Sequence, residues 1–215
     1  MKEKLVIATT NKNKVERIKK ILKNVNFEIV SLSDVIKNEI KEPEEHYETG
    51  IDNALEKAIY YVNYFSENTL VLAQYDTIKL IGIEDKDDPK GHIKEPVIKK
   101  YGKFTDELAA KYYCDLATKY GGTIPMVFKY GHALAIISNK DRLRKKVLSA
   151  ESTLEVRLVN KIHKLDKRPG YFLSALMEAK INNEWVPYND LDDEQLIELD
   201  MDLQDSIISL LKEIQ

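Results

Sequence analysis

The hydrophobic pattern of the first thirty or so residues predicts a strand, a helix and a second strand. Residues 5–8 form a short, partly β-branched apolar run, which is typical of a buried strand. Asn11 is a favourable N-cap residue, and apolar residues then recur at helical spacing as far as Leu22. Residues 27–32 alternate between apolar and polar, as in a second strand. A helical connection between two strands favours parallel pairing.

The middle of the chain predicts further helices and strands around polar loops. A second helix begins near Thr49 or Asp52, with apolar residues on one face. Strands are expected over 69–73 and 77–83, and the polar stretch 84–96 is expected to be a long loop.

The second half of the chain is expected to contain a third helix, a hairpin and a terminal helix. Thr105 caps the third helix, whose inward residues are predicted to be Leu108, Tyr112 and Leu116. The β-rich stretches 126–137 and 145–162 follow as a long hairpin. The tail is predicted to be a single amphipathic helix that starts at Asp193, with leucines and isoleucines on the inward face.

These elements predict an α/β fold, with a twisted mixed sheet, flanking helices and two lobes around a central cleft. Lobe one is expected to span about 1–120 together with the C-terminal helix, and lobe two about 121–190. Because the two lobes are continuous with each other, we expect one α/β domain over 1–215.

Composition narrows the classes of function. The chain has 215 residues and a formal net charge of -3, so no overall positive field indicates a nucleic-acid partner. The single cysteine, Cys114, excludes an internal disulfide framework and a cysteine-rich zinc site. No apolar run is long enough to span a bilayer, so no membrane association is expected. The chain opens directly into a strand pattern without a signal peptide, so we expect a cytoplasmic protein.

Candidate chemistry begins at the first strand-to-helix turn. Thr9, Thr10 and Asn11 bring hydroxyl and amide groups to a helix N-terminus, where the helix dipole favours negative charge. Lys14 lies one turn further on and can reach back over that point. These groups suit a phosphate site, although an ordinary N-cap with solvated lysines explains the same residues.

Two motifs in the first sixty residues resemble the inosine triphosphate pyrophosphatase family. Residues 9–14 match its opening pattern Thr-x-Asn-x-x-Lys. An acidic loop follows, and then a helix that carries Asn-Ala-x-x-Lys-Ala, here with Asn53 and Lys57. Glu44 or Glu45 falls where the family has a metal-binding glutamate. A solvated acidic turn and a surface lysine are the alternatives for these two features.

Three later segments match the family in part. Asp76 and Thr77 correspond to its Asp-Ser or Asp-Thr pair, although Tyr75 replaces an acid, and a plain turn between two strands is the alternative. His92 follows Pro89 and Gly91 in place of a Pro-Gly-x-Tyr/His loop, and Gly170 and Tyr171 remain from a glycine-rich segment. Leu210 and Leu211 stand where the family has His-Arg.

The resemblance implies a metal-dependent hydrolase of inosine triphosphate pyrophosphatase-like fold. It would convert nucleoside triphosphates, above all non-canonical purine ones, to monophosphate and pyrophosphate with Mg²⁺, and would form a homodimer. Asp76 and Lys14 would be catalytic, and Glu44 or Glu45 would bind the metal with Asp76. The substrate-binding residues would be Thr9, Thr10, Asn11, Lys14, Asn53, Lys57, Thr77, His92, Gly170 and Tyr171.

Two other classes of function remain open. A nucleotide-binding protein without turnover would keep the turn at residues 9–14, and a scaffold or partner-binding protein would keep only the fold. Tyr75, Leu210 and Leu211 favour these two classes, whereas Lys14 and Asp76 favour the enzyme, which we expect.

Overall fold

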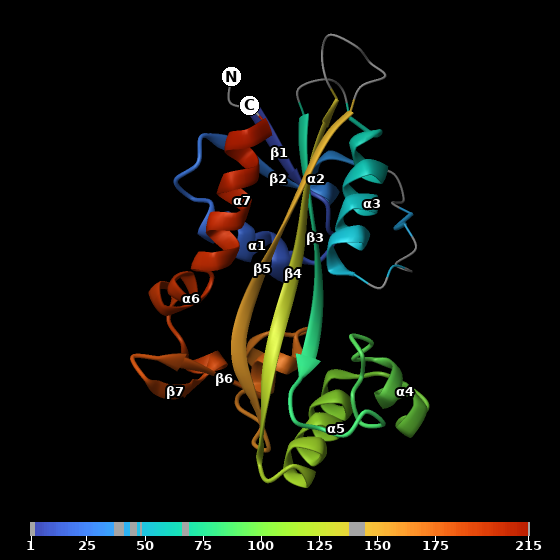
Figure 1. Cartoon of the computed structure of the whole chain (residues 1–215), viewed down its shortest axis with the longest axis vertical. Helices are drawn as coiled ribbons and strands as arrows, with labels where there is room; N and C mark the ends of the chain where they lie inside the picture. The colour runs from blue at the N-terminus through green and yellow to red at the C-terminus, as the bar shows by residue number, and fades with distance from the viewer. Residues whose placement is uncertain are drawn as a thin grey trace. The chain divides into compact units, whose positions relative to one another are not determined.

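The fold is built on one mixed sheet, shown in Figure 1 in a computed structural model. The structure describes residues 3–36, 41–43, 47, 49–65, 69–137 and 145–214, with nothing described of the side chain of Lys145. Seven strands lie in the order β2-β1-β3-β4-β5-β6-β7. Their bounds are β1 Glu3–Ile7, β2 Phe27–Ser31, β3 Thr69–Leu80, β4 Thr123–Ile137, β5 Lys145–Val159, β6 Met177–Ile181 and β7 Glu184–Pro187.

The helices described in the structure lie between and after these strands. They are α1 Lys12–Ile21, α2 Leu32–Val35, α3 Gly50–Val62, α4 Glu95–Tyr101, α5 Asp106–Lys119, α6 Asp193–Leu199 and α7 Met201–Ile214. Three short 3-10 helices cover Leu165–Lys167, Phe172–Ala175 and Tyr188–Asp190. No helix among the described residues is both long and apolar enough to cross a membrane.

The strand pairing confirms the mixed α/β sheet expected from the sequence. β1 lies between β2 and β3 and is parallel to both, with Leu5 opposite Ile29 and Leu70. β6 pairs antiparallel with β5 and with β7. β4 and β5 are neighbours, and the connection over 138–144 is too short for a parallel crossover, which supports the predicted hairpin.

The chain divides into two compact units. The first comprises Met1–Asp76, Lys129–Thr153 and Asp200–Gln215, and the second Thr77–Phe128 and Leu154–Leu199. The boundaries therefore fall within β3 and β4, within β5, and between α6 and α7. The grouping of all residues into one domain stays a prediction.

The first unit has helices on both faces of its part of the sheet. Figure 1 shows α1 and α7 on one face and α3 on the other. A cluster of mostly small buried residues packs α3 against the strands, with Ala54 and Ala58 of α3 beside Ala133 and Ala135 of β4. On the opposite face α7 buries Leu203 and other apolar residues, and Gln204 donates a hydrogen bond to the carbonyl of Ile21 in α1. Small side chains let α3 approach the sheet closely.

The second unit has an aromatic core around α5. Thr105 caps α5, as predicted, by accepting a hydrogen bond from the Leu108 amide. Tyr113 is fully buried, stacks on Phe172 at 5.6 Å between ring centroids, and donates to the carbonyl of Ile93. Of the residues predicted to face inward, Leu116 is buried, whereas Leu108 and Tyr112 are only half-buried. The other residues that α5 buries are Ala109, Ala110, Tyr113 and Ala117.

Three sequence-based element assignments need correction. Residues 69–80 form the single strand β3, so Tyr75 and Asp76 lie within a strand and not in a turn. This stretch has no glycine or proline to end the strand, and the aspartate alone suggested a turn. Helix α4 follows the polar loop and was missed. It has a proline in its first turn and ends at Gly102, which has a left-handed φ of 75°.

The predicted single C-terminal helix is instead two helices. α6 ends at Leu199 and α7 begins at Met201, with Asp200 between them. α7 has a buried apolar face, whereas α6 buries none of its residues. The periodic leucines continue across the break, so the hydrophobic pattern alone did not reveal it.

Candidate functional site

The first turn of α1 is built by side-chain capping. The Oδ1 atom of Asn11 accepts hydrogen bonds from the amides of Asn13 at 2.9 Å and Lys14 at 3.4 Å. The hydroxyl of Thr9 accepts from the Asn11 amide at 3.1 Å. The N-cap prediction for Asn11 is therefore confirmed. Since the cap occupies the amides of Asn13 and Lys14, an anion at this turn would depend on side chains more than on those two amides.

Lys14 and Asp76, which are far apart in the sequence, meet in the first unit. The ammonium nitrogen of Lys14 lies 2.9 Å from Oδ2 of Asp76, and the two side chains are 31% and 25% exposed. Oδ1 of Asp76 is buried and has no hydrogen-bond partner among the described residues. The carboxylate thus has one oxygen paired with a cation and one oxygen with unused acceptor capacity.

The acidic loop reaches the first turn through Glu42. Thr10 donates a hydrogen bond from its hydroxyl to the Glu42 carboxylate at 3.0 Å. Glu44 and Glu45, the predicted metal ligands, lie outside the described residues. The beginning of the acidic loop is therefore beside the predicted phosphate-binding turn.

Helix α3 brings the two other motif residues into the first unit. Asn53 is 5% exposed, and its side-chain amide donates to the carbonyls of Tyr47 at 2.8 Å and Thr49 at 3.0 Å. Its oxygen accepts from the Tyr47 amide at 3.2 Å. Asn53 therefore holds the chain before α3 in place. Lys57 is also buried, at 7% exposure, so it is not the exposed surface lysine considered as an alternative.

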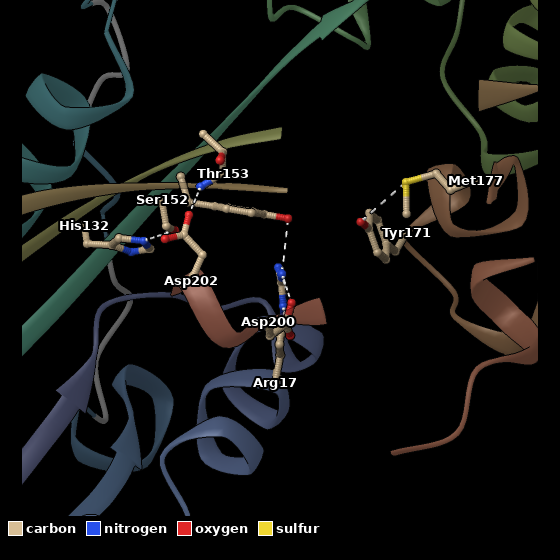
Figure 2. Close-up of polar contacts among 9 residues, drawn as sticks. Arg17, His132, Ser152, Thr153, Tyr171, Met177, Asp200 and Asp202 are labelled. Atoms are coloured by element: carbon tan, nitrogen blue, oxygen red, sulfur yellow. Dashed lines mark hydrogen bonds and ion pairs between the residues drawn. The ribbon is translucent and has the colours of Figure 1, made fainter. Parts of the chain in front are cut away.

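A buried ion pair supports α1 close to Lys14. Figure 2 shows Arg17 of α1 and Asp200, which lies between α6 and α7. Arg17 donates from Nε to Oδ2 of Asp200 at 2.7 Å, and a second guanidinium nitrogen lies 2.5 Å from Oδ1. The guanidinium also lies 4.7 Å from the ring centroid of Tyr130 and donates to its hydroxyl at 3.2 Å. A two-point pair of this kind fixes the orientation of both groups.

A buried histidine lies on the neighbouring part of β4. His132 is fully buried, and its Nε2 is 2.7 Å from the hydroxyl of Ser152 on β5 (Figure 2). Burial lowers the pKa of His132 to about 4, against a smaller opposing effect of Asp76. The imidazole is therefore neutral near pH 7. Asp202 accepts a hydrogen bond from the amide of Thr153 at 2.7 Å, which ties the start of α7 to β5.

Four predicted substrate-binding residues lie in the second unit. The methyl group of Thr77 lies beside Gly91, and His92 lines a hollow of about 570 Å³ with several lysines. The amide of Gly170 donates to Asp106 at 2.6 Å, and the ring of Tyr171 packs edge-on against Tyr188. Their assignment to substrate binding stays a prediction.

Leu210 and Leu211 have a plain structural role. They are 3% and 4% exposed and belong to the buried face of α7. They contribute to the core of the first unit.

Sequence reasoning missed Arg17, His132, Asp200 and Glu42. Arg17 follows Lys14 by nearly one helical turn, which could have placed both on one face of α1. His132 stands among apolar residues of a strand pattern, and nothing in the sequence indicated its contact with Ser152. Asp200 lies in a stretch rich in acids, where no local pattern distinguishes it.

The described residues fit a divalent cation only in part. They contain no group of three or more histidine, cysteine, aspartate or glutamate side chains placed to hold a metal. The buried Oδ1 of Asp76 offers one oxygen of the kind that Mg²⁺ prefers. Since Mg²⁺ usually keeps several waters, one or two carboxylates are sufficient.

Comparisons with known sequences point to one family. Residues 5–77 match the Ham1 family model. A dITP/XTP pyrophosphatase of Mannheimia succiniciproducens is 43% identical over 60 residues, which cover 28% of this chain and 29% of that protein. A dITP/XTP pyrophosphatase of Malacoplasma penetrans is 27% identical over 145 residues, or 61% of this chain and 67% of that protein. The match with 43% identity thus covers less than a third of that relative's length.

Solved structures agree with the fold along the whole chain. A HAM1 protein from Coxiella burnetii has a TM-score of 0.64 at 13% identity and covers 98% of this chain and 99% of its own. The Staphylococcus aureus Ham1 protein has a TM-score of 0.60 at 16% identity, with coverage of 99% and 97%. At these identities the similarity establishes the fold alone.

Proposed function

We propose that this chain is a divergent member of the Ham1 family, whose model its residues 5–77 match, and that it is a metal-dependent nucleoside triphosphate pyrophosphatase. The observation that carries the proposal is the pairing of Lys14 in the first turn of α1 with Asp76 of β3. It joins a cation and a carboxylate that are separated by about sixty residues. The cation follows the carboxyl end of the parallel strand β1, where α/β folds commonly bind ligands.

The phosphate chain would bind to the first turn of α1. The Lys14 ammonium has three donors, so it can hold a phosphate oxygen while it stays beside Asp76. The hydroxyl of Thr9 and the side-chain NH2 group of Asn11 would add neutral hydrogen bonds, and the hydroxyl of Thr10 would add one by turning from Glu42 toward the phosphate. Lys57 of α3 would supply further positive charge.

Asp76 would act on the water that attacks the α-phosphate. Its buried Oδ1 has unused acceptor capacity, so it can orient that water or take its proton. Asp76 with Glu44 or Glu45 would also hold Mg²⁺. When bound, Mg²⁺ supplies positive charge to the phosphate oxygens as negative charge develops on the departing pyrophosphate.

The proposed substrates are non-canonical purine nucleoside triphosphates. This class is supported by the relatives described as dITP/XTP pyrophosphatases. Thr77, His92, Gly170 and Tyr171 are proposed to contact the substrate, and Asn53 to hold the chain at Tyr47 in place. The proposal includes a cytoplasmic location and a homodimer, for which light scattering should give about twice the 24.8 kDa chain mass.

A nucleotide-binding protein without turnover is the second candidate. Oδ2 of Asp76 already pairs with Lys14, which favours a site where the carboxylate neutralises a lysine and does not activate water. Such a protein would bind a triphosphate through the same turn and leave it intact.

Product analysis distinguishes the two candidates. The purified chain is incubated with Mg²⁺ and a panel that includes dITP, XTP and the common nucleoside triphosphates, and the products are separated by chromatography. The proposal predicts monophosphate and pyrophosphate in equal amounts, and no products when Mg²⁺ is chelated. Binding without any product would support the second candidate, and diphosphate with orthophosphate would contradict both.

A further inference from the structure

Helix α3 meets the sheet through two glycines without any intervening side chain. Gly50 is the first residue of α3, and Gly131 is a buried residue of β4. A β-carbon added at Gly131 would lie 2.5 Å from the amide nitrogen of Ile51, and still closer to the carbonyl group of Gly50. Real β-carbons do not lie this close to backbone atoms, so α3 can contact β4 in this way only if residue 131 is glycine.

The contact is asymmetric between the two glycines. A β-carbon added at Gly50 would lie 3.4 Å from the carbonyl oxygen of Tyr75 and 3.5 Å from the amide of Gly131, which is ordinary van der Waals contact. Alanine is therefore compatible with position 50 but not with position 131. The helix rests on the backbone of β4 and β3 at this point.

Position 131 is an unexpected place for a glycine. It lies in the interior of a long strand and does not have a positive φ, so no turn requires it. The α3 side of β4 continues with Ala133 and Ala135, both fully buried against α3. On this side of β4, the residue that contacts the first turn of α3 therefore has no side chain.

The contact lies beside the proposed catalytic carboxylate. Tyr75, whose carbonyl faces Gly50, directly precedes Asp76 on β3. From the same helix turn, Asn53 holds the backbone of Tyr47 by hydrogen bonds to both its amide and its carbonyl. Displacement of this turn would move Asn53 and Lys57 relative to Asp76.

We propose that Gly131 is a positioning residue of the hydrolytic site, which seats the first turn of α3 on the sheet next to Asp76. This inference rests on the proposed function. A side chain at position 131 must push α3 away from β3 and β4. Because displacements of about 1 Å near reacting groups can cost on the order of 100-fold in rate, activity should respond more than folding does.

The test compares Gly131→Ala with Gly50→Ala, which adds the same methyl group on the other side of the contact. With Gly131→Ala we expect kcat for dITP or XTP to fall at least about tenfold, with KM changed less than about threefold. Gly50→Ala should keep both constants within about twofold. Hydrogen exchange should accelerate at residues 49–54 in Gly131→Ala and stay unchanged in β1 and α7.

Folding is checked separately by circular dichroism and by cooperative urea unfolding. If Gly131→Ala does not fold, Gly50→Val is measured instead. The branched side chain at position 50 also separates α3 from the sheet, but it displaces the helix less than a side chain at position 131. That variant should lose activity to an intermediate degree.

Three results overturn the inference: a folded Gly131→Ala with kcat within twofold of the parent, equal losses in Gly131→Ala and Gly50→Ala, or unchanged exchange at residues 49–54. Failure of the proposed function has a different signature, since the parent chain itself would then release no pyrophosphate. In that case the exchange measurement, with affinity for a non-hydrolysable triphosphate analogue, still decides whether Gly131 positions α3.

Discussion

At the scale of single residues, Lys14 connects the helix cap with the proposed catalytic carboxylate, Asp76. Its backbone amide belongs to the Asn11 cap, while its ammonium group pairs with Asp76. The capping interpretation and the phosphate interpretation of this turn are therefore compatible, because they use different atoms of the same residues. Taken alone, the turn favoured an ordinary cap in the sequence, since the contact of Lys14 is with a residue on a distant strand.

Lys14→Ala should weaken triphosphate binding by about tenfold or more, because it removes a positive charge from the proposed phosphate site. Affinity for the corresponding nucleoside, which has no phosphate, should stay the same. Calorimetric titration of both ligands measures this difference. Lys12→Ala is the matched control, since Lys12 is an exposed lysine of the same turn. Equal weakening of nucleoside and triphosphate would argue against a phosphate role for Lys14.

His132 should make the stability of the protein depend on pH. Its pKa is about 4 in the folded chain and about 6.5 when exposed, so below pH 6.5 the unfolded state binds a proton that the folded state does not. The free energy of unfolding should therefore fall between pH 6.5 and pH 4, by roughly 3 kcal/mol in all, and be insensitive to this group outside that window.

Urea unfolding at several pH values measures this contribution. His132→Gln should flatten the curve between pH 6.5 and pH 4, whereas His92→Gln, at an exposed position, should not. An unchanged slope in His132→Gln would show that other groups cause the pH dependence.

At the scale of elements, Arg17 and Asp200 join α1 to the start of α7. Asp200 is 4% exposed and Arg17 21% exposed, so the pair is largely removed from water. Breaking one side of such a pair leaves an uncompensated charge, whereas replacing both sides with apolar residues does not. The break between α6 and α7, absent from the hydrophobic pattern, coincides with this ion pair.

Asp200→Leu should lower the free energy of unfolding by about 3 kcal/mol, because Arg17 then loses its carboxylate partner. The double variant Arg17→Met with Asp200→Leu should recover at least half of that loss. Urea denaturation of the parent, both single variants and the double variant gives the coupling energy. Strictly additive losses would contradict the view that these residues act as a pair.

Elements with strong local signals were predictable from the sequence. The Asn11 and Thr105 caps and the strand-helix-strand opening follow from capping chemistry and periodicity, and the structure confirms them. The continuity of β3 through Asp76 was not predictable, since polar residues in a strand resemble a turn when the neighbouring strands are unknown. Helix α4 was not predicted, because it begins in a polar stretch that contains prolines, which is typical of a loop.

At the scale of the whole molecule, the sequence predicted the fold class better than it predicted which distant residues meet. The mixed sheet follows from element order, and the similarity of residues 5–77 to the Ham1 family follows from the motifs of the first sixty residues. The pairing of Lys14 with Asp76 needed three-dimensional structure, as did the glycine contact between α3 and β4. Both depend on strand order, which brings β3 between β1 and β4 and which no local pattern encodes.

The central claim is that Asp76, beside Lys14, performs hydrolysis at a site that binds triphosphate independently of it. Asp76→Asn keeps the shape of the side chain and removes its charge and basicity, so turnover and binding can be measured separately in the same variant. The account predicts that Asp76→Asn releases no detectable pyrophosphate from dITP or XTP with Mg²⁺, while its affinity for a non-hydrolysable analogue stays within about threefold of the parent. Turnover equal to that of the parent would contradict it.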